Sequence, residues 1–194
     1  PRKFEQAHLV LGFEAPSYRE DEFFAAQVLS GLLGGGMSSR LFQEVRERRG
    51  LCYAIYSSAW GLKDTGLFAV HAATGAGMVG ELINVVSDEL DRMADAGPKD
   101  AEVARAKAQL KAGLMMSLES SSARAEQMAR QMLLHGRVLL TSDILAAVDR
   151  VTAAEVTNVA QRLRRKDVSV AVVGAGRKSD DLASRAGDRL ARVA

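Results

Sequence analysis

The sequence predicts an α+β fold with a mostly antiparallel sheet. Apolar and polar residues alternate in Ala7–Glu14 and again in Asp167–Gly174, near the two ends of the chain, as they do in half-buried strands. Between these two stretches, a predicted hairpin is followed by helical periodicity over residues 78–164. Strands and helices are therefore segregated rather than alternating along the chain, which favours an antiparallel sheet with helices beside it.

The stretch after the first strand is predicted as two helices joined by a glycine run. The first helix is expected from Ser17 or Tyr18 to Leu33, where Gly34–Gly36 interrupts the helical pattern. Ser38 is expected to cap the second helix, because its hydroxyl can accept a hydrogen bond from a free backbone N–H.

Gly50 is predicted to end this second helix, since glycine tolerates the left-handed turn found at helix ends. Leu51–Trp60 follows and is rich in β-branched, aromatic and small residues, which suits a strand. The turn 63–66 leads into a second strand, Leu67–Ala73, so these two strands form a hairpin.

Five helical segments are predicted between this hairpin and the last strand. Thr141 is expected to cap one of them, and Thr152 with Glu155 forms a capping box, in which each side chain satisfies a backbone donor. Residues 177–194 are expected to be a polar tail with a frayed helix, after a single domain over residues 1–176. The predicted segments are 78–93, 99 to about 119, about 123–134, 142–148 and 153–164.

Composition excludes several classes of protein. The chain has 194 residues, of which 47% are hydrophobic, enough for a substantial core. Its 26 basic and 24 acidic residues nearly balance, which argues against a dedicated nucleic-acid binder. The single cysteine, Cys52, excludes an internal disulfide and is interpreted as a small core residue. No apolar run is long enough to span a membrane. Residues 1–6 lack the apolar core of a signal peptide. A cytoplasmic location is favoured over a periplasmic one.

Three short motifs in the same order carry a family resemblance. Gly-Gly-Gly-Met-Ser-Ser-Arg-Leu-Phe at 34–42, Glu-Val-Arg-Glu at 44–47 and Gly-Leu-Cys-Tyr at 50–53 resemble the carboxyl-terminal half of pitrilysin/insulinase zinc peptidases, which include the mitochondrial processing peptidases. The resemblance extends from the first strand to the last. It implies a sheet of about four to six strands with helices packed on one face.

The resemblance also implies roles for particular residues. Arg46 and Tyr53 match a catalytic pair: the Tyr53 hydroxyl would hydrogen-bond the scissile carbonyl oxygen, and Arg46 would bind the substrate backbone. Gly34, Gly35 and Gly36, with Ser38, resemble a shortened glycine-rich loop past which a peptide substrate could run closely. Spacing alone leaves open that Arg46 is a solvated helix charge and Tyr53 a core residue. Tyr56 is expected on the opposite strand face, in a packing role.

The zinc motif of the family is absent from this chain. His-x-x-Glu-His places two histidines on one helix face and a glutamate general base between them, whereas the histidines here are the scattered His8, His71 and His135. The first two are expected to be half-buried in strands and the third to end a helix. No metal or other cofactor is expected here, and zinc would come from a partner half or subunit bearing His-x-x-Glu-His. Without it the chain is expected to be inactive, and self-association is possible.

The sequence also bears on three other functions. A non-catalytic scaffold or assembly subunit of the same family is the main alternative. Gly75–Gly80 has the G-x-G-x-x-G spacing of a dinucleotide site, but such a site also needs another parallel strand soon afterwards. Gly31–Ser38 has the spacing of a phosphate-binding loop, but Met37 stands where that loop requires lysine.

Overall fold

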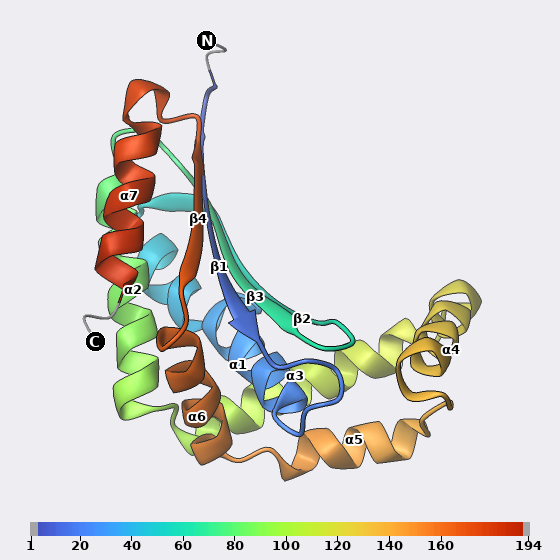
Figure 1. Cartoon of the computed structure of the whole chain (residues 1–194). Coiled ribbons are helices and arrows are strands. Elements are labelled where there is room, and N and C mark those ends of the chain that lie inside the picture. The colour runs from blue at the N-terminus through green and yellow to red at the C-terminus, as the bar shows by residue number, and fades with distance from the viewer. Residues whose placement is uncertain (1–3, 192–194) are drawn as a thin grey trace.

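A four-stranded antiparallel sheet organises the protein. The computed structural model describes residues 4–191, and its strands lie in the order β2-β3-β1-β4, with every neighbouring pair antiparallel (Figure 1). The predicted α+β class is confirmed. The strands are β1 (Ala7–Ala15), β2 (Cys52–Gly61), β3 (Gly66–Thr74) and β4 (Val168–Val173).

Helices cover one face of this sheet (Figure 1). Alternate residues of β1 are buried, among them Leu9, Leu11 and Phe13, because successive side chains of a strand point to opposite faces. Against the buried face α1 packs on β2, α6 on β1 and α7 on β4. The helices of this layer are α1 (Phe23–Gly34), α2 (Val79–Ala96), α6 (Ala153–Arg164) and α7 (Ser179–Leu190).

Three further helices form an extension, called the arm below, that leaves the sheet. They are α3 (Asp100–Ser117), α4 (Ser121–His135) and α5 (Thr141–Arg150). In Figure 1, α4 stands apart from the sheet, and only Gln131 of its residues is buried. The Arg19 guanidinium donates to the Leu134 carbonyl oxygen at 2.7 and 3.0 Å, so α4 is tied to the body of the molecule mainly at its carboxyl end.

Some helix starts differ from the prediction. Helix α1 begins at Phe23 rather than at Ser17 or Tyr18. The Ser17 N–H donates to the Glu20 carboxylate at 2.7 Å, and such local side-chain bonds compete with helix formation. The capping box of Thr152 and Glu155 is confirmed, whereas Thr141 makes no capping hydrogen bond and is itself the first residue of α5.

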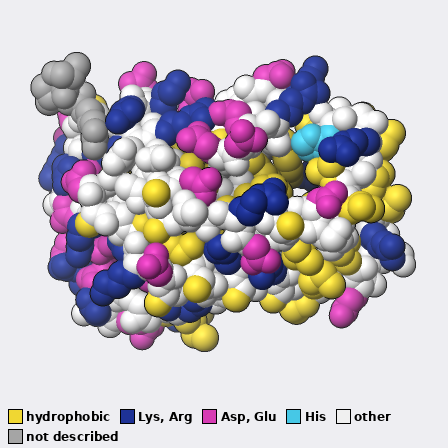
Figure 2. All heavy atoms as spheres, turned by 90° about the horizontal axis from the view of Figure 1, so that it is seen from below, with side chains coloured by type: hydrophobic (Ala, Val, Ile, Leu, Met, Phe, Trp, Pro, Cys, Tyr) yellow, Lys and Arg dark blue, Asp and Glu magenta, His cyan; other side chains and the backbone are white. Residues whose placement is uncertain are grey.

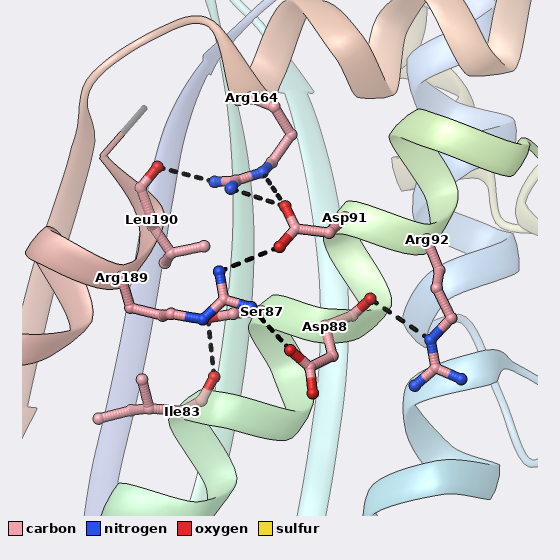
Figure 3. A network of polar contacts seen from close by, with 8 residues as sticks. All are labelled: Ile83, Ser87, Asp88, Asp91, Arg92, Arg164, Arg189 and Leu190. Atoms are coloured by element: carbon pink, nitrogen blue, oxygen red, sulfur yellow. Dashed lines mark hydrogen bonds and ion pairs between the residues drawn. The ribbon is translucent and has the colours of Figure 1, made fainter. Parts of the chain in front are cut away.

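The carboxyl-terminal helix packs on the body instead of fraying. In α7, Leu182, Ala186 and Leu190 are buried in the same core as the sheet. Figure 3 shows how polar contacts join it to α2 and α6: Arg189 of α7 pairs with Asp91 of α2, and Arg164 of α6 donates a hydrogen bond to the Leu190 carbonyl oxygen. Residues 192–194 of the predicted tail, like residues 1–3 at the amino end, lie outside the described residues.

The chain topology excludes the dinucleotide unit suggested by Gly75–Gly80. Helix α2 does follow β3. The next strand, β4, comes only after α6, and in the described sheet it pairs with β1 and not with β3, so no compact unit of two neighbouring parallel strands joined by one helix is formed. None of the described helices is long and apolar enough to cross a membrane.

Candidate functional site

Arg46 is placed by a short π-helix. Residues Phe42–Glu47 form this π-helix, called η1, whose backbone hydrogen bonds span five residues instead of the four of an α-helix. Val45 is completely buried, so its neighbour Arg46 is directed outward. Ser38 makes no capping bond here, because the Ser39 hydroxyl donates to the Gly36 carbonyl oxygen at 2.6 Å and closes the turn instead.

Gly50 reverses the chain between Arg46 and Tyr53. Its φ is +62°, a left-handed value that favours glycine, and its N–H donates to the Arg46 carbonyl oxygen at 3.1 Å. Leu51 is buried, and its carbonyl oxygen accepts a hydrogen bond from the Thr74 hydroxyl at the end of β3. The reversal therefore leads directly into the hairpin.

A β-bulge at the start of β2 decides where Tyr53 lies. Cys52 is paired with Thr74 and Ala54 with Ala73, so Tyr53 is the additional residue between them. The Tyr53 side chain is 74% exposed. Tyr56, expected on the opposite face in a packing role, is also exposed, because the bulge offsets the alternation by one residue.

The Arg46 guanidinium lies near two aromatic rings. Its central carbon is 4.7 Å from the ring centre of Phe42 and 5.4 Å from that of Tyr53, which are distances of cation–π attraction. Glu47 Oε1 lies 3.8 Å from Arg46 Nε, as a loose ion pair. The predicted pair is therefore brought together on one exposed surface. Phe42, part of the motif but without a predicted role, completes this cluster.

The glycine run divides into a buried and an accessible part. A side chain on Gly34 would bring its Cβ within 2.2 Å of the Ser57 backbone nitrogen, so this glycine allows α1 to pack directly against β2. Gly35 and Ser38 are exposed and Gly36 is partly exposed. These three form the accessible side of the loop.

Charge pairing fixes the helix that carries Arg46. The Arg40 guanidinium donates to both carboxylate oxygens of Glu102 in α3, at 2.7 and 2.9 Å, and to the Gly97 carbonyl oxygen. Hydrogen bonding to Arg40 lowers the pKa of Glu102 to about 2. Glu89 in α2 is almost fully buried, and this burial raises its pKa.

The remaining nucleophilic and metal-ligating side chains are scattered. Burial raises the pKa of Cys52 to about 11, so its thiol is a core group, as predicted. His71 is half-buried and His135 ends α4, as predicted, but His8 is exposed. Within residues 4–191 no group of His, Cys, Asp and Glu side chains is arranged to hold a metal ion, so these residues do not fit a zinc site.

A cavity of about 1280 Å³ lies between the arm and the body. It is bounded by α1, α3, α4, α5 and the tip of the β2–β3 hairpin. Figure 2 shows this end of the molecule from below, with hydrophobic side chains gathered around a hollow. The arm exposes large aliphatic side chains: Met115, Met116, Met128, Met132, Leu133, Val138 and Leu140.

The α+β body carries Arg46 and Tyr53 together on an exposed surface. The family model for the Peptidase M16 inactive domain matches residues 1–110, and the chain belongs to this family. The resemblance to pitrilysin/insulinase peptidases is thereby confirmed.

Two bacterial relatives are longer than the part that this chain matches. An uncharacterized zinc protease of Streptomyces coelicolor is 39% identical over 190 residues, covering 98% of this chain and 41% of that protein. The uncharacterized zinc protease YmxG of Bacillus subtilis is 33% identical over 172 residues, covering 89% of this chain and 42% of that protein. The chain thus spans about two fifths of the length of the curated relatives it matches.

Solved structures share the fold. Complex III from Candida albicans contains a chain with a TM-score of 0.85 and 20% identity, matched over 96% of this chain and 47% of that one. A protease from Helicobacter pylori has a TM-score of 0.76 and 22% identity, matched over 87% of this chain and 41% of that one. The peptidase M16 inactive domain from Pseudomonas fluorescens has a TM-score of 0.75 and 23% identity, matched over 88% of this chain and 41% of that one.

Proposed function

We propose that this chain is the substrate-contacting, zinc-less half of a zinc metallopeptidase. The observation that carries the proposal is the exposed position of Tyr53 beside the Arg46 guanidinium, on a chain that belongs to the M16 inactive domain. Bulges are frequent next to active sites, where they redirect a side chain. Here the bulge directs a phenol away from the core beside a fixed cation.

In this proposal Tyr53 and Arg46 act on the peptide while a His-x-x-Glu-His lobe supplies zinc and the general base. The Tyr53 hydroxyl donates a hydrogen bond to the scissile carbonyl oxygen and stabilises the charge that develops there. Arg46 holds the peptide backbone by donating to its carbonyl oxygens. Donors aimed at a developing oxyanion stabilise the transition state more than the ground state. Gly35, Gly36 and Ser38 form the accessible loop along which the peptide passes.

The arm supports the need for a partner. Its seven exposed aliphatic side chains, with Leu133 at 83% exposure, form the kind of surface that obligate partners bury. The relatives extend well beyond the part that this chain matches, so the remaining part of a longer protein, or a separate subunit, is the partner we assign to the arm.

Reconstituted cleavage tests this function. The chain is mixed with the His-x-x-Glu-His half and zinc-dependent hydrolysis of an unfolded peptide is followed. Tyr53→Phe should lower kcat/KM by about 10²–10³-fold, the loss seen for one oxyanion donor. Arg46→Ala should also lower kcat/KM, chiefly through a higher KM. Tyr18→Phe and Arg48→Ala are the matched controls, since they remove a hydroxyl and a guanidinium elsewhere.

A scaffold or assembly subunit is the second candidate. It is favoured by the aliphatic arm and by the TM-score of 0.85 to a chain of complex III. The same experiment separates the two functions. A stable complex whose cleavage rate is unaffected by Tyr53→Phe and Arg46→Ala would support the scaffold and reject the assigned roles.

A further inference from the structure

The face of the sheet away from the helices carries a cluster of three rings. The Tyr56 ring stacks on the His71 ring, with centroids 4.9 Å apart and an angle of 9° between their planes. The Trp60 ring meets His71 edge-on at 6.5 Å. Tyr56 and Trp60 remain 51% and 48% exposed. These three side chains are called the aromatic pad below.

The strand register places small residues between the rings. Ser58 is paired with Ala69, and Ala69 with Gly12, so a row of small residues crosses β2, β3 and β1 between Tyr56 and Trp60. Ala69 is buried, yet it is not among the residues of the helix-covered core. The pad therefore covers this row from the outer side of the sheet.

Two polar atoms at the pad, one of them on its own imidazole, have no hydrogen-bond partner among the described residues. They are the Ser58 hydroxyl oxygen and His71 Nε2, both shielded from solvent. Leaving buried polar atoms unpaired destabilises an arrangement. A ligand that parts the rings and brings its own donors and acceptors would remove this defect, and a peptide backbone carries both kinds of group.

We propose that the aromatic pad binds an apolar or aromatic side chain of an extended peptide. This inference rests on the proposed function, because it assigns a selectivity site for the same substrate. Tyr56 follows Tyr53 by three residues of β2, which is about 10 Å of strand. An extended peptide whose scissile carbonyl lies at Tyr53 therefore places a side chain about three residues away over the pad.

The chemistry of the pad favours a peptide over the partner lobe as the molecule that binds there. The phenol and the indole each combine an apolar ring with a polar atom, and such rigid amphipathic side chains are common in recognition surfaces. The exposed side chains of the arm, by contrast, are aliphatic. In addition, β2 is the outermost strand on its side of the described sheet, so a peptide running along β2 meets no neighbouring strand there.

Fluorescence of this chain alone tests the inference, because Trp60 is its single tryptophan. The probes are two synthetic decapeptides of Gly, Ser and Lys that differ only at one central position, Phe or Ala. The Phe peptide should shift Trp60 emission saturably and bind about three- to tenfold more tightly than the Ala peptide, as one aromatic contact allows. Tyr56→Thr, which keeps a β-branched side chain in the strand, should abolish this preference. Tyr56→Phe should preserve it, and so should Leu133→Ser on the arm.

Equal affinity for the two peptides would overturn the proposal, as would a preference that survives Tyr56→Thr. A shift of Trp60 emission with protein concentration and no peptide would also overturn it, since a second copy would then cover the pad. The test needs neither zinc nor cleavage. A Phe preference in a chain that fails to support hydrolysis would reject the proposed function alone, and the reverse result would reject the pad alone.

Discussion

The central carbon of the Arg46 guanidinium lies 5.4 Å from the ring centre of Tyr53. The two residues are seven positions apart, and the chain between them contains the end of a π-helix, a left-handed glycine and a β-bulge. Each of these irregular features shortens or turns the path from one residue to the other. The surface that they form is thus a product of local backbone geometry, and this geometry can be tested by substitution.

The left-handed turn at Gly50 should be intolerant of a side chain. Gly50→Ala is expected to destabilise the protein by about 1 kcal/mol or more, because L-residues are strained at positive φ. A Cβ there would meet no atom within 4 Å, so the cost lies in the backbone alone. Gly113→Ala, in the middle of α3 and also without close neighbours, should instead stabilise by about 0.5–1 kcal/mol. Urea unfolding measures the change in unfolding free energy for each variant. Changes of the same sign in the two variants would contradict the left-handed turn at Gly50.

Alanine substitutions within the glycine run should differ in their effect on stability. Gly34→Ala places a methyl group against the β2 backbone and should cost about 1–3 kcal/mol through overpacking. At Gly36 the nearest atom to a new Cβ is the Gln109 amide nitrogen at 4.0 Å, so Gly36→Ala should be nearly neutral. Thermal unfolding of the two variants provides the comparison. A strongly destabilised Gly36→Ala variant would show that this part of the loop is also packed.

The ion pairs that hold α7 should differ in strength (Figure 3). Arg164 is buried, and its guanidinium donates to Asp91 at 2.8 Å and to the Leu190 carbonyl oxygen at 2.8 Å. Arg164→Ala leaves these acceptors without their buried partner and should cost about 3–5 kcal/mol. Arg189→Ala removes a more exposed pair with Asp88 and should cost about 1 kcal/mol or less. Chemical denaturation ranks the two, and a reversed order would reject this account.

Acid should weaken the link between Arg40 and Glu102. The folded-state pKa of Glu102 is about 2, below its ordinary value of 4.5, so the stability that it contributes is present above about pH 4.5 and is lost as the pH falls towards 2. The difference in unfolding free energy between the natural chain and Glu102→Gln should therefore be constant near neutral pH and shrink across this acid range. A difference that does not change with pH would show that Glu102 titrates normally.

Local pattern was sufficient for most elements. Alternation located β1 and β4, and residue composition with the turn at 63–66 located β2 and β3, each to within a residue or two, while the capping box fixed the start of α6. The helix before the glycine run was placed too early, because Ser17 and Glu20 form a local turn that the apolar pattern does not reveal. The motif around Arg46 and Tyr53 indicated the family that the comparisons show.

By itself, the sequence determined the order of the elements, the family and the absence of a zinc motif, since all three depend on residues that are close together in the chain. Only the tertiary structure decided which side chains share a surface. The bulge exposes Tyr53 and Tyr56 together, and strand register closes three rings over Ser58 and Ala69. Register and bulges depend on pairing between distant strands, and a one-residue shift moves a side chain to the other face. For that reason, periodicity along one strand could not reveal them.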